Sequence, residues 1–331
     1  EHKNKPNDIL NNYIYYFDAN SLYPTGMIQE LPTGEMEWSD DLTYQSSSSV
    51  SSSGSSMEKD GYVYEVDLKY PTNLHEKTKH FPFCPENKTI PNDWLTKWQQ
   101  ENKNKDYKST KKLICDQTNK KNYIIEGRML DWYLDHGIIL EKIHKKLIYK
   151  KTKWLKPYIE FNIKKRNEAK AKESKDQFGD FFYKLLNNAF YGKTLENVRN
   201  RQEIKIVHTK EKMEHYKSKI GFVRTEIFTE DIAAIHFKKS KIRFDKFNFI
   251  GFTILEYSKL VMYSFIYDGL EKHLSGKYKI HAGDTDSLFV EFIIPENETF
   301  EENLNKIKEY IIPDELLKIK NEKSNNDVLE F

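Results

Sequence analysis

The sequence predicts an α+β protein that combines short strands, one long apolar helix and a helical hairpin. Strand-like segments occur near both ends of the chain, at residues 13–17 and 278–292. Two successive segments with helical periodicity, 155–175 and 177–197, meet near Asp176. The chain has 331 residues, of which 14% are aromatic, so it can bury a core without disulfides.

The first predicted strand ends at a carboxylate. Its aromatic and β-branched residues lead into Asp18 and a turn, and residues 61–70 alternate as a second strand. Between the two, residues 46–56 contain nine serines, which predicts a surface insertion in a loop. We expect Pro24 to keep Tyr23 out of helical conformation, because a proline restricts the residue before it.

The middle of the chain predicts short helices between strands. A capped helix start is expected within residues 90–97, and residues 123–126 should form a strand that leads into a helix at 128–135. Gly137 should end that helix, and residues 138–149 have the pattern of a further strand.

The C-terminal part combines strands with one long helix. Residues 203–237 predict short strands around a polar helix, and residues 249–274 predict the long helix. Its apolar run is interrupted by Glu256, Lys259 and Asp268. We therefore expect this helix to lie in the core and not to cross a membrane.

Charge is balanced overall but unevenly distributed. The chain has a net charge of +2, whereas residues 141–175 hold thirteen Lys and Arg against four Glu. Such a basic unit suits a polyanion such as nucleic acid or a nucleoside triphosphate, although a solvated helical face explains the charges equally well. The only two cysteines, Cys84 and Cys115, favour an intracellular location, whether nucleus, cytoplasm, organelle or virion.

Three carboxylates are the candidates for catalysis. Asp18 ends the first strand, and Asp284 and Asp286 lie at the tip of the predicted hairpin 278–292. Two strands of one sheet could bring them together, and clustered carboxylates require cations, for which two Mg²⁺ ions are the usual answer. An ordinary polar turn is the alternative for Asp284 to Asp286.

A second candidate set lies on one helix. Lys184, Asn188 and Tyr191 fall on one face at 100° per residue. A cation, an amide and an aromatic ring on one stripe suit a nucleotide. A half-buried polar stripe is the alternative.

Taken together and in this order, the segments resemble motifs A, B and C of the family B DNA polymerases. The residues concerned are Asp18-x-x-Ser21-Leu22-Tyr23-Pro24, Lys184-x₃-Asn188-x₂-Tyr191-Gly192 and Asp284-Thr285-Asp286-Ser287. The segments 61–86, 190–197 and 254–263 are similar to protein-primed polymerases of Maverick/Polinton-type mobile elements, viruses and linear plasmids. The resemblance covers nearly the whole chain.

The resemblance implies a family B palm, an antiparallel sheet backed by helices, with a helical-hairpin fingers subdomain and protein-primed-type insertions. We expect a fragment of a larger polymerase, with the exonuclease and thumb missing. The implied divisions are palm with motif A (1–45), a Ser-rich insertion (46–60), a protein-primed-type insertion region (61–150), fingers with motif B (151–197), a second insertion region (198–248), palm with motif C (249–298) and a truncated palm edge (299–331).

The resemblance also implies a role for each motif residue. Asp18 and Asp286 would bridge the metal ions, with Asp284 assisting. The remaining implied contacts are to the nucleotide. In motif A, Ser21 and Leu22 would contact it, and Tyr23 would be the steric gate against a ribose 2′-hydroxyl. In motif B, Lys184 would bind the triphosphate, and the nascent base pair would be lined by Asn188, Tyr191 and Gly192. Further phosphate contacts would come from Arg166, Lys170 and Lys172.

Two positions depart from the family pattern. Ala189 stands where Ser is usual, a change between small residues that should be tolerated. Ala282 stands where Tyr is usual, which removes a ring near the primer end and places primer positioning in doubt.

The function implied is that of a DNA-directed DNA polymerase core. It would use two Mg²⁺ ions, or Mn²⁺ in their place, and its partners would be template-primer DNA, dNTPs and a terminal protein whose hydroxyl can serve as primer, with no membrane partner. The alternative is a catalytically silent nucleic-acid-binding remnant of a decayed mobile-element polymerase.

Overall fold

A three-stranded antiparallel sheet in the order β1–β12–β11 joins the two ends of the described chain. Its strands are β1 (Leu10–Asp18), β11 (Tyr278–Asp284) and β12 (Ser287–Pro295). The computed structural model describes residues 10–47, 59–102, 110–171, 176–295, 298–299, 302–303 and 305–307. One face of this sheet is apolar and buried, through Phe17, Leu288 and Val290 among others. The predicted first strand and hairpin are both confirmed.

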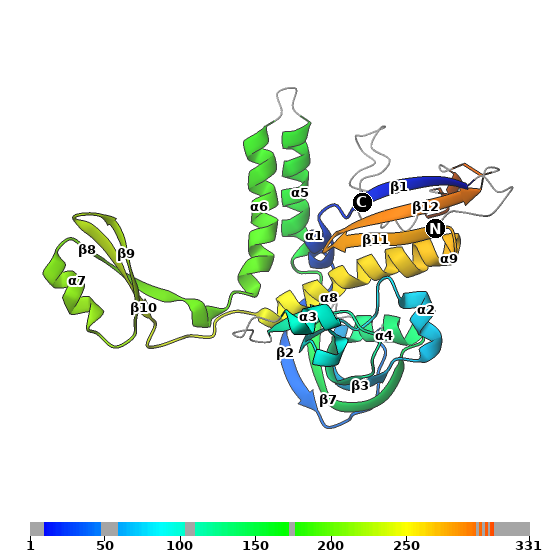
Figure 1. Ribbon diagram of the computed structural model, residues 1–331, viewed down its shortest axis with the longest axis horizontal. Coiled ribbons are helices and arrows are strands. Elements are labelled where there is room, and N and C mark those ends of the chain that lie inside the picture. Colours follow the sequence, from blue (N-terminus) through cyan, green and yellow to red (C-terminus); the bar gives the residue numbers. More distant parts are fainter. Residues whose placement is uncertain are drawn as a thin grey trace.

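A long helix supports the buried face of the sheet (Figure 1). It consists of α8 (Asn248–Ser264), a π-helical segment (Phe265–Glu271) and α9 (Lys272–Leu274). The rings of Phe17 and Phe265 lie 5.3 Å apart between sheet and helix. By length and composition this helix could cross a membrane, but 61% of its most apolar window is buried inside the protein. The predicted long helix in the core is thus confirmed.

The short helix α1 (Leu22–Met27) follows β1 and packs closely on α8. A Cβ on Gly26 would lie 2.9 Å from the backbone oxygen of Ile254, so only glycine fits this contact. The expectation that Pro24 keeps Tyr23 out of helical structure is wrong, because both residues lie in the first turn of α1. Backbone N–H groups have no helical partner in a first turn, so proline is tolerated there.

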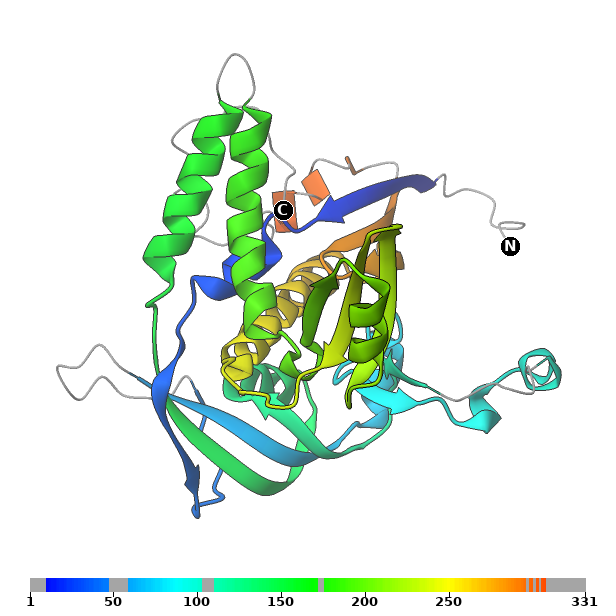
Figure 2. The same cartoon turned by 90° about the vertical axis from the view of Figure 1, so that its left-hand side faces the viewer.

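A second, strongly curved sheet lies on the other side of α8 (Figure 2). Its order is β2–β7–β3–β6, with β2 (Leu31–Ser39), β3 (Lys59–Lys69), β6 (Lys120–Glu126) and β7 (Ile139–Thr152). Helix α4 (Gly127–Asp135) follows β6 directly, and Gly137 ends it with a φ of +97°. These elements confirm the strands and the helix predicted for the middle of the chain.

Smaller elements extend from this sheet. They are η1 (Thr72–Leu74), α2 (His75–Thr78), β4 (Glu86–Thr89), η2 (Asn92–Trp94), α3 (Lys97–Glu101) and β5 (Lys111–Ile114). The helix start predicted within 90–97 is misplaced. The chain makes a single 3₁₀ turn there, and α3 begins only after Thr96, whose side chain accepts a hydrogen bond from the backbone N–H of Gln99.

Two antiparallel helices, α5 (Lys156–Lys170) and α6 (Gln177–Thr194), stand beside the β1–β12–β11 sheet (Figure 1). Buried Asn162 donates to Asn187 at 2.8 Å, and Arg166 pairs with Asp180 at 2.6 Å. Asp176 caps α6 by accepting from the backbone N–H of Gly179. The predicted helical hairpin is confirmed.

An outlying unit is set apart from the remaining elements (Figure 1). It contains η3 (Val198–Asn200), β8 (Gln202–Val207), α7 (Lys210–Lys217), β9 (Phe222–Thr229) and β10 (Ile232–Lys238), with sheet order β8–β10–β9. It has a core of its own, formed by Val207, Ala233, Ile235 and Phe237 under α7. The strands around a polar helix predicted for 203–237 are confirmed.

The close approach of β3 to β7 gives a stability prediction. A Cβ on Gly61 would lie 2.3 Å from the ring of Tyr149, whose hydroxyl donates to buried Glu126. Gly61→Ala should therefore lower the free energy of unfolding by about 1–3 kcal/mol through overpacking, measured by denaturant unfolding. Gly192→Ala is the matched control, because a Cβ there meets no atom within 4 Å in the described chain, and it should leave stability unchanged or raise it. Equal effects of the two substitutions would contradict the packing argument.

Candidate active site

The strand register brings the three predicted carboxylates together. Asp18 pairs with Ser287 across β1 and β12, and Asp284 pairs with the same Ser287 across β11 and β12. The turn between β11 and β12 holds Asp286 after Thr285, which has a φ of +53°. The backbone N–H of Ala19 donates to the backbone oxygen of Asp286 at 2.7 Å, and this bond ties the end of β1 to the turn.

The carboxylates repel one another. Burial, followed by the negative charges of Asp18 and Asp284, raises the pKa of Asp286. The positive charge of Lys184 on α6 acts in the opposite direction and lowers the pKa of Asp286, so this lysine lies within electrostatic range of the carboxylates. The site therefore has an excess of negative charge that a cation would relieve.

Carboxylate oxygens suit a hard divalent cation such as Mg²⁺ or Mn²⁺. Within the described ranges, no group of three or more His, Cys, Asp and Glu side chains has a metal-binding arrangement. The donors that fit such an ion are the carboxylates of Asp18 and Asp286, which the strand register and the Ala19–Asp286 backbone hydrogen bond bring to the same end of the sheet.

The beginning of α1 continues directly from Asp18. Ser21 adopts a left-handed conformation with φ of +59°, and its backbone oxygen accepts from the N–H of Thr25 at 3.0 Å. Leu22 is buried beside α8, and its backbone oxygen accepts from the Ser258 hydroxyl at 3.5 Å. The backbone between Asp18 and α1 is thus held against the core.

A pair of tyrosines connects α1 with α6. The rings of Tyr23 and Tyr191 are stacked, with centroids 4.1 Å apart and 16° between their planes. Burial and the neighbouring Tyr23 raise the pKa of Tyr191 to about 12, so its phenol is neutral at pH 7. Motif reasoning selected both residues but gave no indication that they touch.

The exposed face of α6 carries the other residues predicted for the nucleotide. Lys184, Asn188 and Gly192 are all exposed. A Cβ on Gly192 would find open space, as judged from the described residues. This face of α6 is therefore accessible to a ligand.

The three further phosphate candidates do not share one environment. Arg166 is paired with Asp180, and this hydrogen bond lowers the pKa of the Asp180 carboxyl. Lys170 is exposed at the end of α5, whereas Lys172 lies outside the described residues. Arg166 thus connects the two helices of the hairpin, and a phosphate role for the three remains a prediction.

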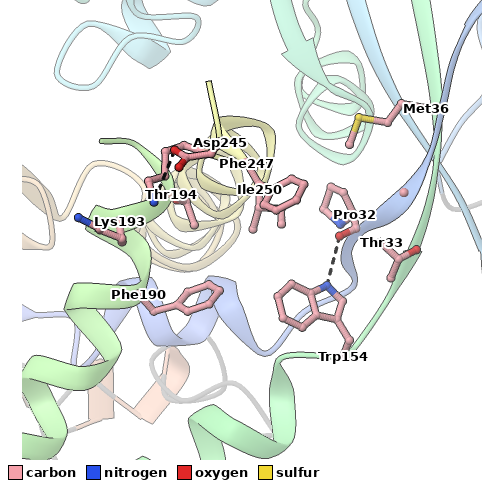
Figure 3. A pocket seen from close by; sticks show the side chains of 12 residues that line it. Pro32, Thr33, Met36, Trp154, Phe190, Lys193, Thr194, Asp245, Phe247 and Ile250 are labelled. Atoms are coloured by element: carbon pink, nitrogen blue, oxygen red, sulfur yellow. Dashed lines mark hydrogen bonds and ion pairs between the residues drawn. The ribbon is translucent and has the colours of Figure 1, made fainter. Parts of the chain in front are cut away.

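A cavity of about 630 Å³ lies at the base of the hairpin and was not predicted from the sequence (Figure 3). Trp154 and Phe190 face Pro32 and Ile250 across it, and Trp154 donates to the backbone oxygen of Pro32 at 3.2 Å. In the described structure none of the predicted site residues lines it. Segments far apart in sequence contribute its walls, so no local pattern indicates it.

Comparisons with known proteins agree with the family inferred from the sequence. A family model described as DNA polymerase type B, organellar and viral, matches residues 2–268. Among solved structures, an orthorhombic crystal form of Phi29 DNA polymerase matches with 14% identity and a TM-score of 0.44, over 86% of this chain and 41% of that chain. The ternary complex of Phi29 DNA polymerase with primer-template DNA and incoming nucleotide matches with 14% identity, over the same shares, with a TM-score of 0.42.

No match was found among curated proteins. The chain spans about 41% of the length of the solved polymerase that it matches. The family match confirms the resemblance inferred from the three motifs.

The repulsion between carboxylates gives a second stability prediction. In EDTA at pH 7, Asp286→Asn should raise the melting temperature by about 1–3 °C, because it removes one of several like charges. The pKa of Asp286 is higher in the folded protein than in the unfolded protein. The stability that this group contributes to the wild type is therefore lost as the pH rises from the unfolded-state pKa through the folded-state pKa. The gain from Asp286→Asn should therefore disappear in acid, where the wild-type carboxyl is protonated.

Asp231→Asn is the control, because it makes the same change of net charge at an exposed turn of the outlying unit. Asp18→Asn should stabilise in the same way, and the double variant should gain less than the sum of the two because both relieve one repulsion. A pH-independent gain, or full additivity, would show that the carboxylates do not interact.

Proposed function

Because the chain belongs to the organellar and viral type B DNA polymerases, we propose that it forms the catalytic core of a DNA-directed DNA polymerase. The observation that carries this proposal is the meeting of Asp18, Asp284 and Asp286 at one end of the β1–β12–β11 sheet, within electrostatic range of Lys184 on α6. Carboxylates that can attract metal ions, near a cation that can attract phosphate, are what phosphoryl transfer requires.

The reaction is template-directed transfer of dNMP from a dNTP. The primer 3′-hydroxyl oxygen bonds to the α-phosphorus and loses its proton, and the bond to the β,γ-pyrophosphate breaks. Asp18 and Asp286, with help from Asp284, would hold two Mg²⁺ ions, or Mn²⁺ in their place. When bound, these ions would stabilise negative charge on the attacking and leaving oxygens. The contribution of the chain itself is positioning and electrostatic complementarity.

The residues on α1 and α6 would select the nucleotide. Lys184 is exposed on α6 and its charge acts on Asp286, so it would complement a triphosphate held near the carboxylates. Tyr23 is held in place by its stack on Tyr191, so its ring forms a rigid wall suited to excluding a ribose 2′-hydroxyl. Asn188 and Gly192 would line the nascent base pair, and the Ser21–Leu22 backbone would contact the triphosphate.

The partners proposed are template-primer DNA, dNTPs and a terminal protein. The last follows from the similarity to protein-primed polymerases, in which a Ser, Thr or Tyr hydroxyl takes the place of the primer 3′-hydroxyl. Arg166 and Lys170 on α5, together with Lys172, remain candidates for phosphate contacts.

Loss of either bridging carboxylate should abolish synthesis. Asp18→Asn and Asp286→Asn should each lower the rate of Mg²⁺-dependent primer extension by about 10³-fold or more, since metal-assisted charge stabilisation is worth several kcal/mol. Extension is measured with a labelled primer-template and dNTPs, and Asp231→Asn should retain wild-type rates. Extension that survives both substitutions would refute the metal assignment.

The same preparation distinguishes a polymerase from a silent DNA-binding protein. Calorimetric titration with Mn²⁺ should show metal binding that depends on dNTP in the wild type and is lost in Asp286→Asn. DNA affinity that falls steeply with salt, without dNTP-dependent metal binding, would instead identify a binding protein.

Tyr23 gives a test of sugar selection. Tyr23→Ala should raise the incorporation of ribonucleotides relative to deoxyribonucleotides by about 10- to 100-fold, because the ring no longer occupies the space of the 2′-hydroxyl. Tyr23→Phe keeps the ring and its stack on Tyr191 and should keep the wild-type ratio. Single-nucleotide incorporation with matched rNTP and dNTP measures the effect, and an unchanged ratio in Tyr23→Ala would remove Tyr23 as the gate.

A further inference from the structure

A buried polar group between α8 and the curved sheet has no role in the function proposed so far. Its centre is the carboxylate of Glu126, the last residue of β6, which is fully buried. The Oε1 atom of this carboxylate accepts from the hydroxyls of Tyr149 at 3.0 Å and Tyr257 at 3.4 Å. The Oε2 atom accepts from the backbone N–H of Arg128 at 2.8 Å. A carboxylate is costly to bury without such partners, so the group holds its members in fixed positions.

Tyr257 is the member of this group that reaches α1. Its hydroxyl also donates to the backbone oxygen of Glu30 at 3.1 Å, in the connection between α1 and β2. A hydroxyl has a single proton, so the two acceptors share it, and the shorter distance favours Glu30. Burial raises the pKa of Tyr257 well above its usual range, so the phenol keeps this proton at neutral pH.

The ring of Tyr257 is held from the side of α4. The guanidinium carbon of Arg128, in the first turn of α4, lies 4.9 Å from the ring centroid. A cation over an aromatic face is attracted to it. Together with the contact of the hydroxyl with Glu126, this fixes the ring relative to the curved sheet. The position of Tyr257 is therefore set independently of α1.

Helix α8 contacts the chain around α1 at two places. Near the start of α1, the hydroxyl of Ser258 donates to the backbone oxygen of Leu22 at 3.5 Å. Just beyond the end of α1, the hydroxyl of Tyr257 donates to Glu30. Tyr23 is the second residue of α1, so the orientation of this short helix determines where the ring of Tyr23 lies.

A small apolar core connects Tyr257 with the stacked tyrosines. Tyr257 belongs to a buried cluster with residues of α1, β2 and α8, and the partly buried rings of Tyr23 and Tyr191 pack against this cluster. The two rings are in direct contact, with centroids 4.1 Å apart. A displacement of α1 at Glu30 would therefore change both the cluster and the stack that rests on it.

We propose that Tyr257 is a positioning residue for nucleotide selection, whose hydroxyl anchors the end of α1 and thereby fixes the ring of Tyr23. The proposal rests on the polymerase function and on the gate role of Tyr23 proposed above. Tyr257 is only 2% exposed, so it acts through α1 and not by touching the nucleotide. Loss of this one hydroxyl should relax sugar discrimination and leave the carboxylates of the β1–β12–β11 sheet in place.

Two buried tyrosines provide a matched pair of substitutions. Tyr257→Phe and Tyr149→Phe each remove a hydroxyl that donates to Glu126, but in the described structure only the hydroxyl of Tyr257 also contacts Glu30. Tyr257→Phe should raise the incorporation of ribonucleotides relative to deoxyribonucleotides by about 3- to 10-fold, the effect of one hydrogen bond. Tyr149→Phe should keep the wild-type ratio. Single-nucleotide incorporation with matched rNTP and dNTP measures both, and the kcat for dNTP should stay unchanged in both.

The link between Tyr257 and Tyr23 can also be measured without activity. Denaturant unfolding of Tyr257→Phe, Tyr23→Ala and the double variant should give non-additive losses of stability, because both substitutions act on the position of α1. The same cycle with Tyr149→Phe in place of Tyr257→Phe should be additive. A purely structural role of Tyr257 would lower stability without moving the nucleotide ratio or coupling to Tyr23.

The outcomes distinguish this inference from the proposed function. Equal nucleotide ratios in Tyr257→Phe and Tyr149→Phe would overturn the positioning role, and a raised ratio in Tyr23→Ala would then leave the gate itself standing. If the wild type incorporates no nucleotide, the polymerase function is refuted and the unfolding cycles alone decide. Non-additivity confined to Tyr257 would in that case support the anchor of α1, and additivity in both cycles would overturn it.

Discussion

The antiparallel register of β1 and β12 is the constraint on which the site depends. The carboxylates repel one another, as the raised pKa of Asp286 indicates, so they cannot be the cause of their own proximity. The apolar face of the sheet is the cause, because Phe17 and Leu288 pair beneath it and bury 98% and 99% of their surface. A slip of one residue would expose Phe17 and turn Asp18 into the core. Hydrophobic burial on one face thus supplies the free energy that holds like charges together on the other.

The second half of the site is held by packing between helices. Gly26 allows α1 to lie against the backbone of Ile254 in α8, and α1 in turn presents Tyr23 to Tyr191. The position of α6 depends on internal contacts of the hairpin, of which the buried Asn162–Asn187 hydrogen bond is one. The position of the Tyr23–Tyr191 pair therefore depends on polar and aromatic contacts between elements, whereas the carboxylate edge depends on a continuous apolar sheet face.

Much of this arrangement could be predicted from local sequence patterns. The strand before Asp18, the hairpin tip at Asp284 to Asp286 and the two helices on either side of Asp176 each have a short-range signature, and the structure has all of them. Local rules failed where two of them compete. Pro24 was expected to keep Tyr23 out of a helix, but the first turn of a helix requires no backbone N–H from Pro24, and both residues lie in the first turn of α1. Contacts between distant segments, such as the contact of Tyr23 with Tyr191, have no local sequence pattern that would predict them.

The outlying unit has a consequence of a different kind. Because Val207, Ala233, Ile235 and Phe237 form a cluster separate from the main core, its packing can change without disturbing the carboxylate sheet. Substitutions there are buffered from the carboxylates of the β1–β12–β11 sheet. We therefore expect new surface chemistry to be tolerated in that unit while the sheet that carries Asp18 stays unchanged.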